Sequence, residues 1–249
     1  MTSLGIIPAR YAASRFEGKV LANIGGKPMI QHVWERAKKA HTLDELIIAA
    51  DDDRIIKVVE EFGGKAVFTS KSHPSGTDRL REIANPLDVD IVVNIQADEP
   101  FLHHSMIDSL ISTLRDDQEA VMASLMRKID DISEMEDSNV VKVVVDKNNS
   151  ALYFSRSPIP FVRNREDLSD LSDNTFYKHI GIYAYTKDFL FTFANLPPSS
   201  LEKYEKLEQL RALENGYKIK MVETNYDTIG VDTPEDLEAA KARLFANQE

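Results

Sequence analysis

Short apolar runs alternate with amphipathic helical segments through the first part of this sequence. Residues 4–7, 46–50 and 66–69 are apolar runs typical of buried parallel strands. The segments between them, 29–37 and 54–62, place their apolar residues at helical spacing. A strand–helix–strand–helix–strand order is half of a doubly wound sheet. The sequence therefore predicts an α/β fold built on a mostly parallel, Rossmann-like sheet.

The second half of the chain changes pattern. Three β-segments occur at residues 140–146, 151–155 and 177–185. No long helix separates the first two, which favours a hairpin. We expect one domain, 1–249, with a small antiparallel, β-rich lobe inserted at about 135–190, whose exposed apolar residues form a homodimer surface. The main sheet then continues with a helix, a strand and a closing helix at 202–215, 218–222 and 234–245.

The composition excludes several classes of function. The chain of 249 residues is 43% hydrophobic, which supports a large core, and its formal net charge is −11. This acidic balance argues against nucleic acid or an anionic membrane as a partner. Because the sequence has no cysteine, disulfides, thiolate catalysis and cysteine-based zinc sites are excluded. No apolar run reaches membrane-spanning length and no signal-type N-terminus is present, so we expect a cytoplasmic protein.

Three cations follow the first strand. Arg10, Arg15 and Lys19 lie in a segment with neither helical nor alternating apolar periodicity. In open α/β sheets, ligands bind outside the carboxyl ends of the strands. This position favours an anionic ligand over the alternative, a solvated loop whose cations pair with surface acids.

Two aspartates are expected at the same edge of the sheet. Asp98 follows the predicted strand at 90–95, and Asp232 precedes the closing helix. Asp98 has an alternative role as a helix cap, whereas Thr233 and Asp236 already provide the cap beside Asp232, which favours a functional role for Asp232. An oxygen-only pair suits Mg²⁺, which takes its other ligands from phosphates and water. With the cations, the pair is typical of phosphoryl or nucleotidyl transfer without a covalent intermediate.

Other motifs are absent or have a structural interpretation. The sequence contains no Walker A loop, G-x-G-x-x-G, metal-spaced histidine pair or G-x-S-x-G elbow. The acidic triplet at 51–53 and the pair Ser75 and Asp78 are predicted to cap helices. Ser75 and Gly76 could also present N–H groups to an anion or a base at a helix N-terminus.

These residues resemble a known family. Pro8-Ala9-Arg10-x-x-x-Ser14-Arg15-x-x-Gly18-Lys19-x-Leu21 resembles the N-terminal signature of the cytidylyltransferases that activate acidic sugars. The resemblance is closest to the 3-deoxy-manno-octulosonate (Kdo) cytidylyltransferase, or CMP-Kdo synthetase, family. Supporting stretches span nearly the whole chain in family order, at 26–30, 75–79, 96–100, 151–156, 179–183, 207–211 and 230–236.

The resemblance implies a Mg²⁺-dependent homodimer with a nucleotidyltransferase fold. Its partners would be CTP and an acidic eight-carbon sugar, giving CMP-Kdo and pyrophosphate for lipopolysaccharide synthesis. The implied catalytic residues are Arg15, Lys19, Asp98 and Asp232, of which Asp98 and Asp232 would hold the metal. Implied nucleotide contacts, in addition to Arg15 on the phosphates, are Ala9, Arg10, Lys19, Ser75 and Gln96. The implied sugar pocket consists of Arg156, His179, Tyr183, Glu208 and Gln209, with Arg156 and His179 supplying positive charge.

Three residues depart from the family pattern. Glu17 and Val20 stand where prolines usually flank Gly18 and Lys19, and Ala97 stands where glycine is usual. We expect Glu17 to point to solvent, because it would otherwise oppose a triphosphate. Ala97 requires a backbone without positive φ.

Two other functions remain open from the sequence. One is a cytidylyltransferase for another acidic sugar, such as an amino-substituted Kdo or a sialic acid. The other is a non-catalytic nucleotide-binding regulator. Retention of both Asp98 and Asp232 argues against the regulator, because binding alone does not require a metal pair.

Overall fold

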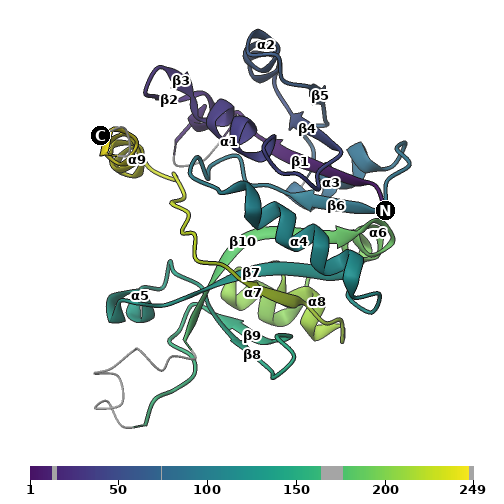
Figure 1. The fold of residues 1–249 in the computed structure, drawn as a ribbon, viewed down its shortest axis with the longest axis vertical. Coiled ribbons are helices and arrows are strands. Elements are labelled where there is room, and N and C mark those ends of the chain that lie inside the picture. The colour runs from purple at the N-terminus through teal and green to yellow at the C-terminus, as the bar shows by residue number, and fades with distance from the viewer. Residues whose placement is uncertain (13–15, 74, 164–175, 247–249) are drawn as a thin grey trace.

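A mixed sheet forms the centre of the computed structural model, which describes residues 1–12, 16–73, 75–163 and 176–246 (Figure 1). Nine strands of the described chain belong to this sheet. Across its continuous path the strands are β11 (Lys220–Glu223), β7 (Met122–Lys128), β10 (Tyr177–Thr186), β6 (Ile91–Asn94), β1 (Ser3–Ala9), β4 (Glu45–Ala50) and β5 (Ala66–Phe68).

The first half of the chain builds a parallel region of the sheet. β1 pairs in parallel with both β4 and β6, and β4 pairs in parallel with β5, which confirms the predicted strand and helix order. The chain moves outward from β1 to β5 and then returns to the other side of β1. A topological switch point therefore lies between β1 and β6, and the loops after these two strands flank it.

β10 runs antiparallel to both of its neighbours, β6 and β7. Its N-terminal end also pairs with β8 (Lys142–Val145), which pairs with β9 (Ala151–Ser155). Assigning all of residues 177–185 to the inserted lobe was therefore wrong, because the second part of β10 is a central strand of the main sheet. We propose that a single domain, 1–249, carries an inserted lobe that consists of β8, β9 and the start of β10, which is shorter than the expected 135–190.

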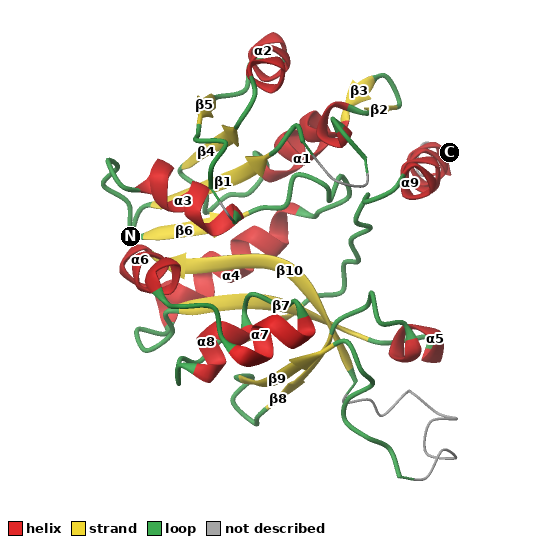
Figure 2. Cartoon of the chain, turned by 180° about the vertical axis from the view of Figure 1, so that it is seen from behind, coloured by secondary structure: helices red, strands yellow, loops and turns green. Residues whose placement is uncertain are grey.

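Helices cover both faces of the sheet (Figures 1 and 2). Successive strand residues point to opposite faces, so Ile7 packs in one core and Ile6 in the other. The first core includes residues of α1 (Met29–Ala37), α2 (Asp53–Glu61) and α4 (His104–Asp116). The second includes residues of α3 (Gly76–Ala84), α6 (Lys187–Asn195) and α8 (Leu210–Glu214). The sequence patterns did not predict α6.

The helix expected at 202–215 is two helices, α7 (Ser200–Glu205) and α8. Lys206 has a left-handed φ of 56°, which ends α7, so Glu208 lies in the connection and Gln209 is the N-cap of α8. The remaining elements are the 3-10 helix η1 (Lys19–Leu21), the hairpin strands β2 (Asn23–Ile24) and β3 (Lys27–Pro28), α5 (Ile132–Glu136) and α9 (Pro234–Ala246). Among the described residues, no helix combines the length and apolar character that a membrane span requires.

Candidate active site

Two distant segments bring Asp98 and Asp232 to one point. Asp98 follows β6, and Asp232 precedes α9. The N–H of Val231 donates to the backbone oxygen of Asp98 over 2.9 Å, which joins the two segments. The Nζ of Lys19 then donates to Asp98 Oδ2 at 2.6 Å and to Asp232 Oδ1 at 2.8 Å. The structure therefore brings together one cation and two carboxylates that the sequence singled out.

A glycine turn places Lys19 at this point. Gly18 adopts a left-handed φ of 68°, and its N–H donates to the backbone oxygen of Tyr11 over 2.8 Å. A Cβ at Gly18 would lie 3.1 Å from the Tyr11 ring, so both the conformation and the space favour glycine. Lys19 follows directly as the first residue of η1.

One ammonium faces two carboxylates at this point, which leaves one negative charge uncompensated, and the carboxylates fit a metal ion. Burial lowers the pKa of Lys19, but the carboxylates of Asp98 and Asp232 outweigh this effect and raise it above its usual value. Both carboxylates reach a single cation with their oxygens, which is the donor chemistry that Mg²⁺ prefers. In the described chain, no three acidic, histidine or cysteine side chains gather as a complete metal site. A metal held by this pair would therefore complete its coordination with water and substrate.

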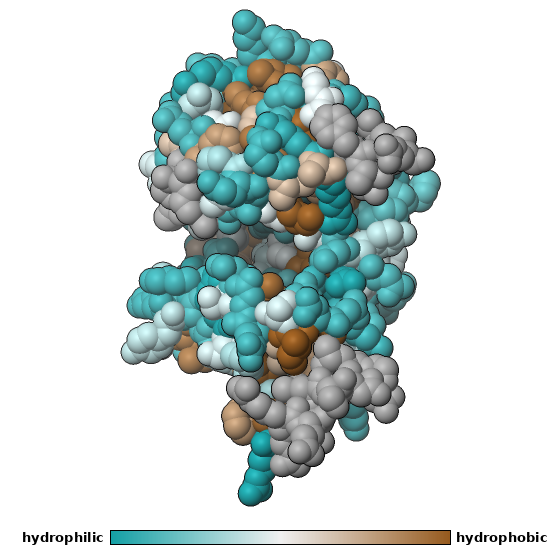
Figure 3. All heavy atoms as spheres, turned by 90° about the vertical axis from the view of Figure 1, so that its left-hand side faces the viewer, coloured by the Kyte–Doolittle hydropathy of each residue, from teal (hydrophilic) through white to brown (hydrophobic). Residues whose placement is uncertain are grey.

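A cavity of about 580 Å³ opens beside this group. Figure 3 shows the surface hollowed on the side of the molecule where β1 and β6 end. Arg10 and Lys19 line the cavity together with Gln96. The amide of Gln96 donates to the backbone oxygen of Gly181 over 3.0 Å, at the irregularity where the β10–β7 register shifts. Ala9, also expected at this site, is buried at the end of β1 and does not line the cavity.

A second cavity, of about 800 Å³, shares Tyr183 and Asp232 with the first. His179 and Gln209 line the second cavity, whereas Glu208 lines the first. Gln209 is buried, and its Nε2 has no hydrogen-bond partner in the described chain. Two connected cavities of this kind can hold two substrates against a common wall.

His179 does not supply the positive charge expected of it. Its Nε2 lies 2.8 Å from the hydroxyl of Ser124, and its ring packs edge-on against Phe154. Burial lowers the pKa of His179 to about 3, so the imidazole is neutral near pH 7. It can therefore serve the cavity as a neutral hydrogen-bonding group and not as a cation.

Arg156 lies outside both cavities. Its Nε donates to the backbone oxygen of Glu205 over 2.8 Å and its Nη1 to that of Ser138 over 3.0 Å. Neither cavity counts Arg156 among its lining residues. Its assignment to the sugar pocket stays a prediction that the geometry of this chain alone does not support.

The remaining expectations have mixed outcomes. Ser75 caps α3: its hydroxyl accepts from the N–H of Asp78 over 3.3 Å, while Gly76 and not Ser75 lines the first cavity. Glu17 is exposed, as predicted. Ala97 lines the first cavity and is not among the described residues with positive φ, so its methyl group fits the backbone. Arg15 lies outside the described residues.

Sequence reasoning missed two buried ionisable groups near the site. The ammonium of Lys178 contacts Asp227 at 2.9 Å and also Glu134, and all three line the second cavity. The available signal was a lysine within an otherwise apolar alternating strand.

Glu99 is the second of these groups. Burial, reinforced by the neighbouring Asp98, raises the pKa of Glu99 to about 8.

The neutral state of His179 predicts a pH dependence of stability. As pH falls below about 6.5, the unfolded chain binds a proton on this imidazole, whereas the folded chain does so only near pH 3. The free energy of unfolding should therefore decrease on acidification. This decrease should be smaller in the His179→Gln variant. We expect a difference on the order of 1 kcal/mol between pH 7 and pH 5, measured by urea unfolding. The exposed His41→Gln serves as control, and equal pH slopes in all three proteins would contradict the assignment.

Comparisons with known proteins agree with this geometry. A family model described as cytidylyltransferase matches residues 4–219. A 3-deoxy-manno-octulosonate cytidylyltransferase from Geotalea uraniireducens is 53% identical over 251 residues, covering 98% of this chain and 99% of the relative. One from Syntrophobacter fumaroxidans is 54% identical over 242 residues, covering 96% and 95%.

Solved structures extend the comparison to the fold. The structure of CMP:2-keto-3-deoxy-manno-octonic acid synthetase complexed with CTP matches with a TM-score of 0.92 and 43% identity, covering 100% of both chains. A 4-diphosphocytidyl-2C-methyl-D-erythritol synthase from Anaerococcus prevotii shares the fold, with a TM-score of 0.62, 20% identity and 98% of both chains covered. This chain is a nucleotidyltransferase that belongs to the 3-deoxy-manno-octulosonate cytidylyltransferase family.

Proposed function

We propose that this enzyme transfers CMP from CTP to the anomeric hydroxyl of Kdo, giving CMP-Kdo and pyrophosphate for lipopolysaccharide synthesis. The observation that carries the proposal is the pair of cavities that meet at Tyr183 and Asp232. The first cavity contains the cations that a triphosphate needs. The second offers the hydrogen-bonding side chains of His179 and Gln209 together with the ammonium of Lys178, which is paired with Asp227 and Glu134. Family membership and the match to a CTP-bound relative support the same reaction.

The first cavity is the proposed nucleotide site. Arg10 and Lys19 face the space in which a triphosphate would lie. A cation about 4 Å from a phosphate charge contributes on the order of 4 kcal/mol of attraction in a partly solvated pocket. Gln96 lines the same cavity, and because its Nε2 donates to Gly181, its amide oxygen is the atom proposed to accept a hydrogen bond from a base.

Asp98 and Asp232 are the proposed ligands of Mg²⁺. When bound, the metal would supply positive charge to the phosphate oxygens as the charge on the leaving pyrophosphate grows. Lys19 bridges both carboxylates and compensates one of their two negative charges, so it keeps the pair together without the metal. A triphosphate entering the first cavity offers the ammonium of Lys19 a new anionic partner.

The second cavity is the proposed sugar site. The buried Nε2 of Gln209 has no hydrogen-bond partner among the described residues, so it is a donor that could reach a carboxylate or hydroxyl oxygen after a side-chain adjustment. His179 adds a neutral imidazole. From this side the sugar hydroxyl approaches the shared wall at Asp232, and a bond forms between its oxygen and the α-phosphorus. The bond from that phosphorus to the bridging oxygen of pyrophosphate breaks, and the hydroxyl proton is released.

The reaction predicts pyrophosphate release from CTP, Mg²⁺ and Kdo, and chelation with EDTA should stop it. A panel of Kdo, amino-substituted Kdo and a sialic acid identifies the acceptor. Release with another acid sugar but not with Kdo would contradict the proposed substrate. Absence of release with every sugar, despite CTP binding, would favour the non-catalytic regulator.

We also propose that the β9 side of the inserted lobe forms a homodimer interface. Within the described chain, β9 forms a strand ladder only with β8, and beyond the Ala151 N–H, which donates to Ile219, no strand pairs with its other edge. Leu152 on β9, Phe161 beyond it and Tyr204 on α7 are 61%, 87% and 84% exposed. Exposed large apolar side chains on this part of the chain are typical of a protein interface.

The dimer prediction is tested by sedimentation velocity. The wild type should have the mass of two chains, and the double variant Leu152→Glu/Phe161→Glu should have the mass of one. Phe68→Glu is the matched control, because Phe68 is 48% exposed on β5 at the opposite edge of the sheet. A monomeric wild type, or a double variant that remains dimeric, would contradict the proposed interface.

A further inference from the structure

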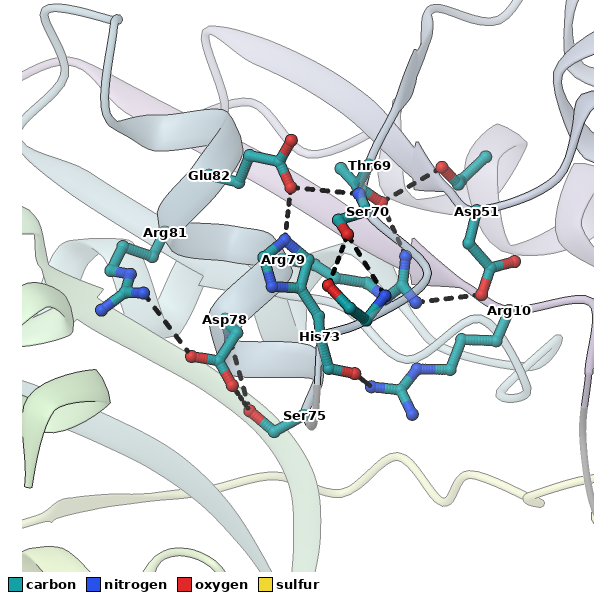
Figure 4. A network of polar contacts seen from close by, with 12 residues as sticks. Arg10, Asp51, Thr69, Ser70, His73, Ser75, Asp78, Arg79, Arg81 and Glu82 are labelled. Atoms are coloured by element: carbon teal, nitrogen blue, oxygen red, sulfur yellow. Dashed lines mark hydrogen bonds and ion pairs between the residues drawn. The ribbon is translucent and has the colours of Figure 1, made fainter. Parts of the chain in front are cut away.

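A buried ion pair lies beside the first cavity without lining it (Figure 4). Arg79 of α3 is 1% exposed. Its Nη2 donates to Asp51 Oδ2 over 2.9 Å, and its Nη1 donates to the hydroxyl of Thr69 over 2.7 Å. Asp51 follows β4 and Thr69 follows β5, so one guanidinium holds the ends of two adjacent strands.

Asp51 connects this pair to the nucleotide loop. Its second oxygen, Oδ1, accepts from the backbone N–H of Tyr11 over 2.9 Å. The backbone oxygen of Tyr11 in turn accepts from the N–H of Gly18, the residue before Lys19. The Tyr11 ring lies beneath Gly18 and stacks on the guanidinium of Arg54, with 3.4 Å from its CZ to the ring centre. Asp51 therefore holds the backbone of Tyr11. Tyr11 lies at the start of the cationic loop and, through its bond with Gly18, also positions the end of that loop.

Arg79 also fixes the opposite wall of the cavity. It lies one turn into α3, whose first residue, Gly76, lines that wall. The backbone oxygen of His73, shortly before α3, accepts from Arg10 Nη2 over 3.1 Å. Two sets of contacts thus connect the loop after β1 to the start of α3. One runs from Arg10 to His73, and the other runs from Tyr11 through Asp51 to Arg79.

Stability alone does not explain a charged pair at this place. Burying two charges costs several kcal/mol of desolvation, and well-packed apolar residues often replace such pairs without loss of stability. Arg79 Nε has no hydrogen-bond partner in the described chain, so the pair is also incompletely satisfied. A guanidinium, however, donates hydrogen bonds to two acceptors in a fixed planar geometry. Neither an apolar residue nor lysine can do this.

We propose that Arg79 and Asp51 are positioning residues for the nucleotide, acting through the Tyr11 peptide on Arg10 and Lys19. The inference rests on the proposed function, in which these two cations hold the triphosphate. Since no residue of β1, of the loop after it or of α3 lines the second cavity, loss of the pair should weaken CTP binding and leave the sugar site largely unchanged.

The test measures CTP affinity by calorimetry, and KM for each substrate, in Arg79→Met, Asp51→Asn and the double variant. We expect CTP affinity to fall at least about tenfold in each single variant, with KM for the sugar near the wild-type value. Because both residues act through one linkage, the double variant should be no weaker than the worse single variant. Arg79→Lys should fail to rescue, and Thr69→Val, which removes only one acceptor, should give a smaller loss in the same direction.

Arg81→Met is the matched control on the same helix. Arg81 is part-exposed and contacts Asn195 at 3.0 Å and Asp78 at 3.9 Å, away from Asp51. Wild-type CTP affinity in folded Arg79→Met, Arg79→Lys and Thr69→Val variants would overturn the inference, as would an equal rise in both KM values. Failure of the proposed function is distinguishable, because the wild type would then bind no CTP or release no pyrophosphate with any sugar.

Discussion

The contact of one lysine with two aspartates organises this molecule. Asp98 and Asp232 belong to segments far apart in the sequence, and both carry negative charge into a partly buried place. Lys19 bridges them, and the Val231 to Asp98 backbone bond joins their segments. This contact connects the segment before α9 to the end of β6. All three side chains line the first cavity, and Asp232 also lines the second, so the arrangement of the site depends on this interaction.

The antiparallel strand β10 explains why there are two cavities. A fully parallel sheet would offer a single crevice at the switch point beside β1. β10 instead inserts between β6 and β7 and carries Gly181 and Tyr183 to the crevice from the opposite direction. Tyr183 lines both cavities, and His179 lines the second. The backbone oxygen of Gly181 accepts the hydrogen bond from Gln96.

Local patterns in the sequence predicted much of the fold and singled out the two aspartates that meet at Lys19. The strands of the first half followed from apolar runs. Asp232 was singled out because its neighbours already complete a cap, and the structure shows that cap: Asp236 N–H donates to Thr233 Oγ1, and Asp236 Oδ2 accepts from the N–H of Thr233. The predicted N-cap by the acidic triplet is also confirmed, since Asp52 accepts from Arg54 N–H.

Contacts between distant segments could not be predicted in this way. Asp51 belongs to the same triplet, but its partners Tyr11 and Arg79 are set by strand order, which no local pattern contains. The predicted helix is divided at Lys206, whose backbone is left-handed. Glycine usually signals this conformation in a sequence, and here the residue is a lysine. The neutral His179 follows from burial against Phe154, which depends on how the lobe packs on β10.

Anomalous diffraction from crystals grown with CTP and Mn²⁺ tests the proposed metal site. We expect a metal peak within bonding distance of both Asp98 and Asp232, with the ammonium of Lys19 moved from the carboxylates to the phosphates. The Asp98→Asn variant should lose the peak while keeping its fold. A metal bound elsewhere, or Lys19 still bridging both carboxylates in the loaded enzyme, would contradict the proposed roles of these three residues.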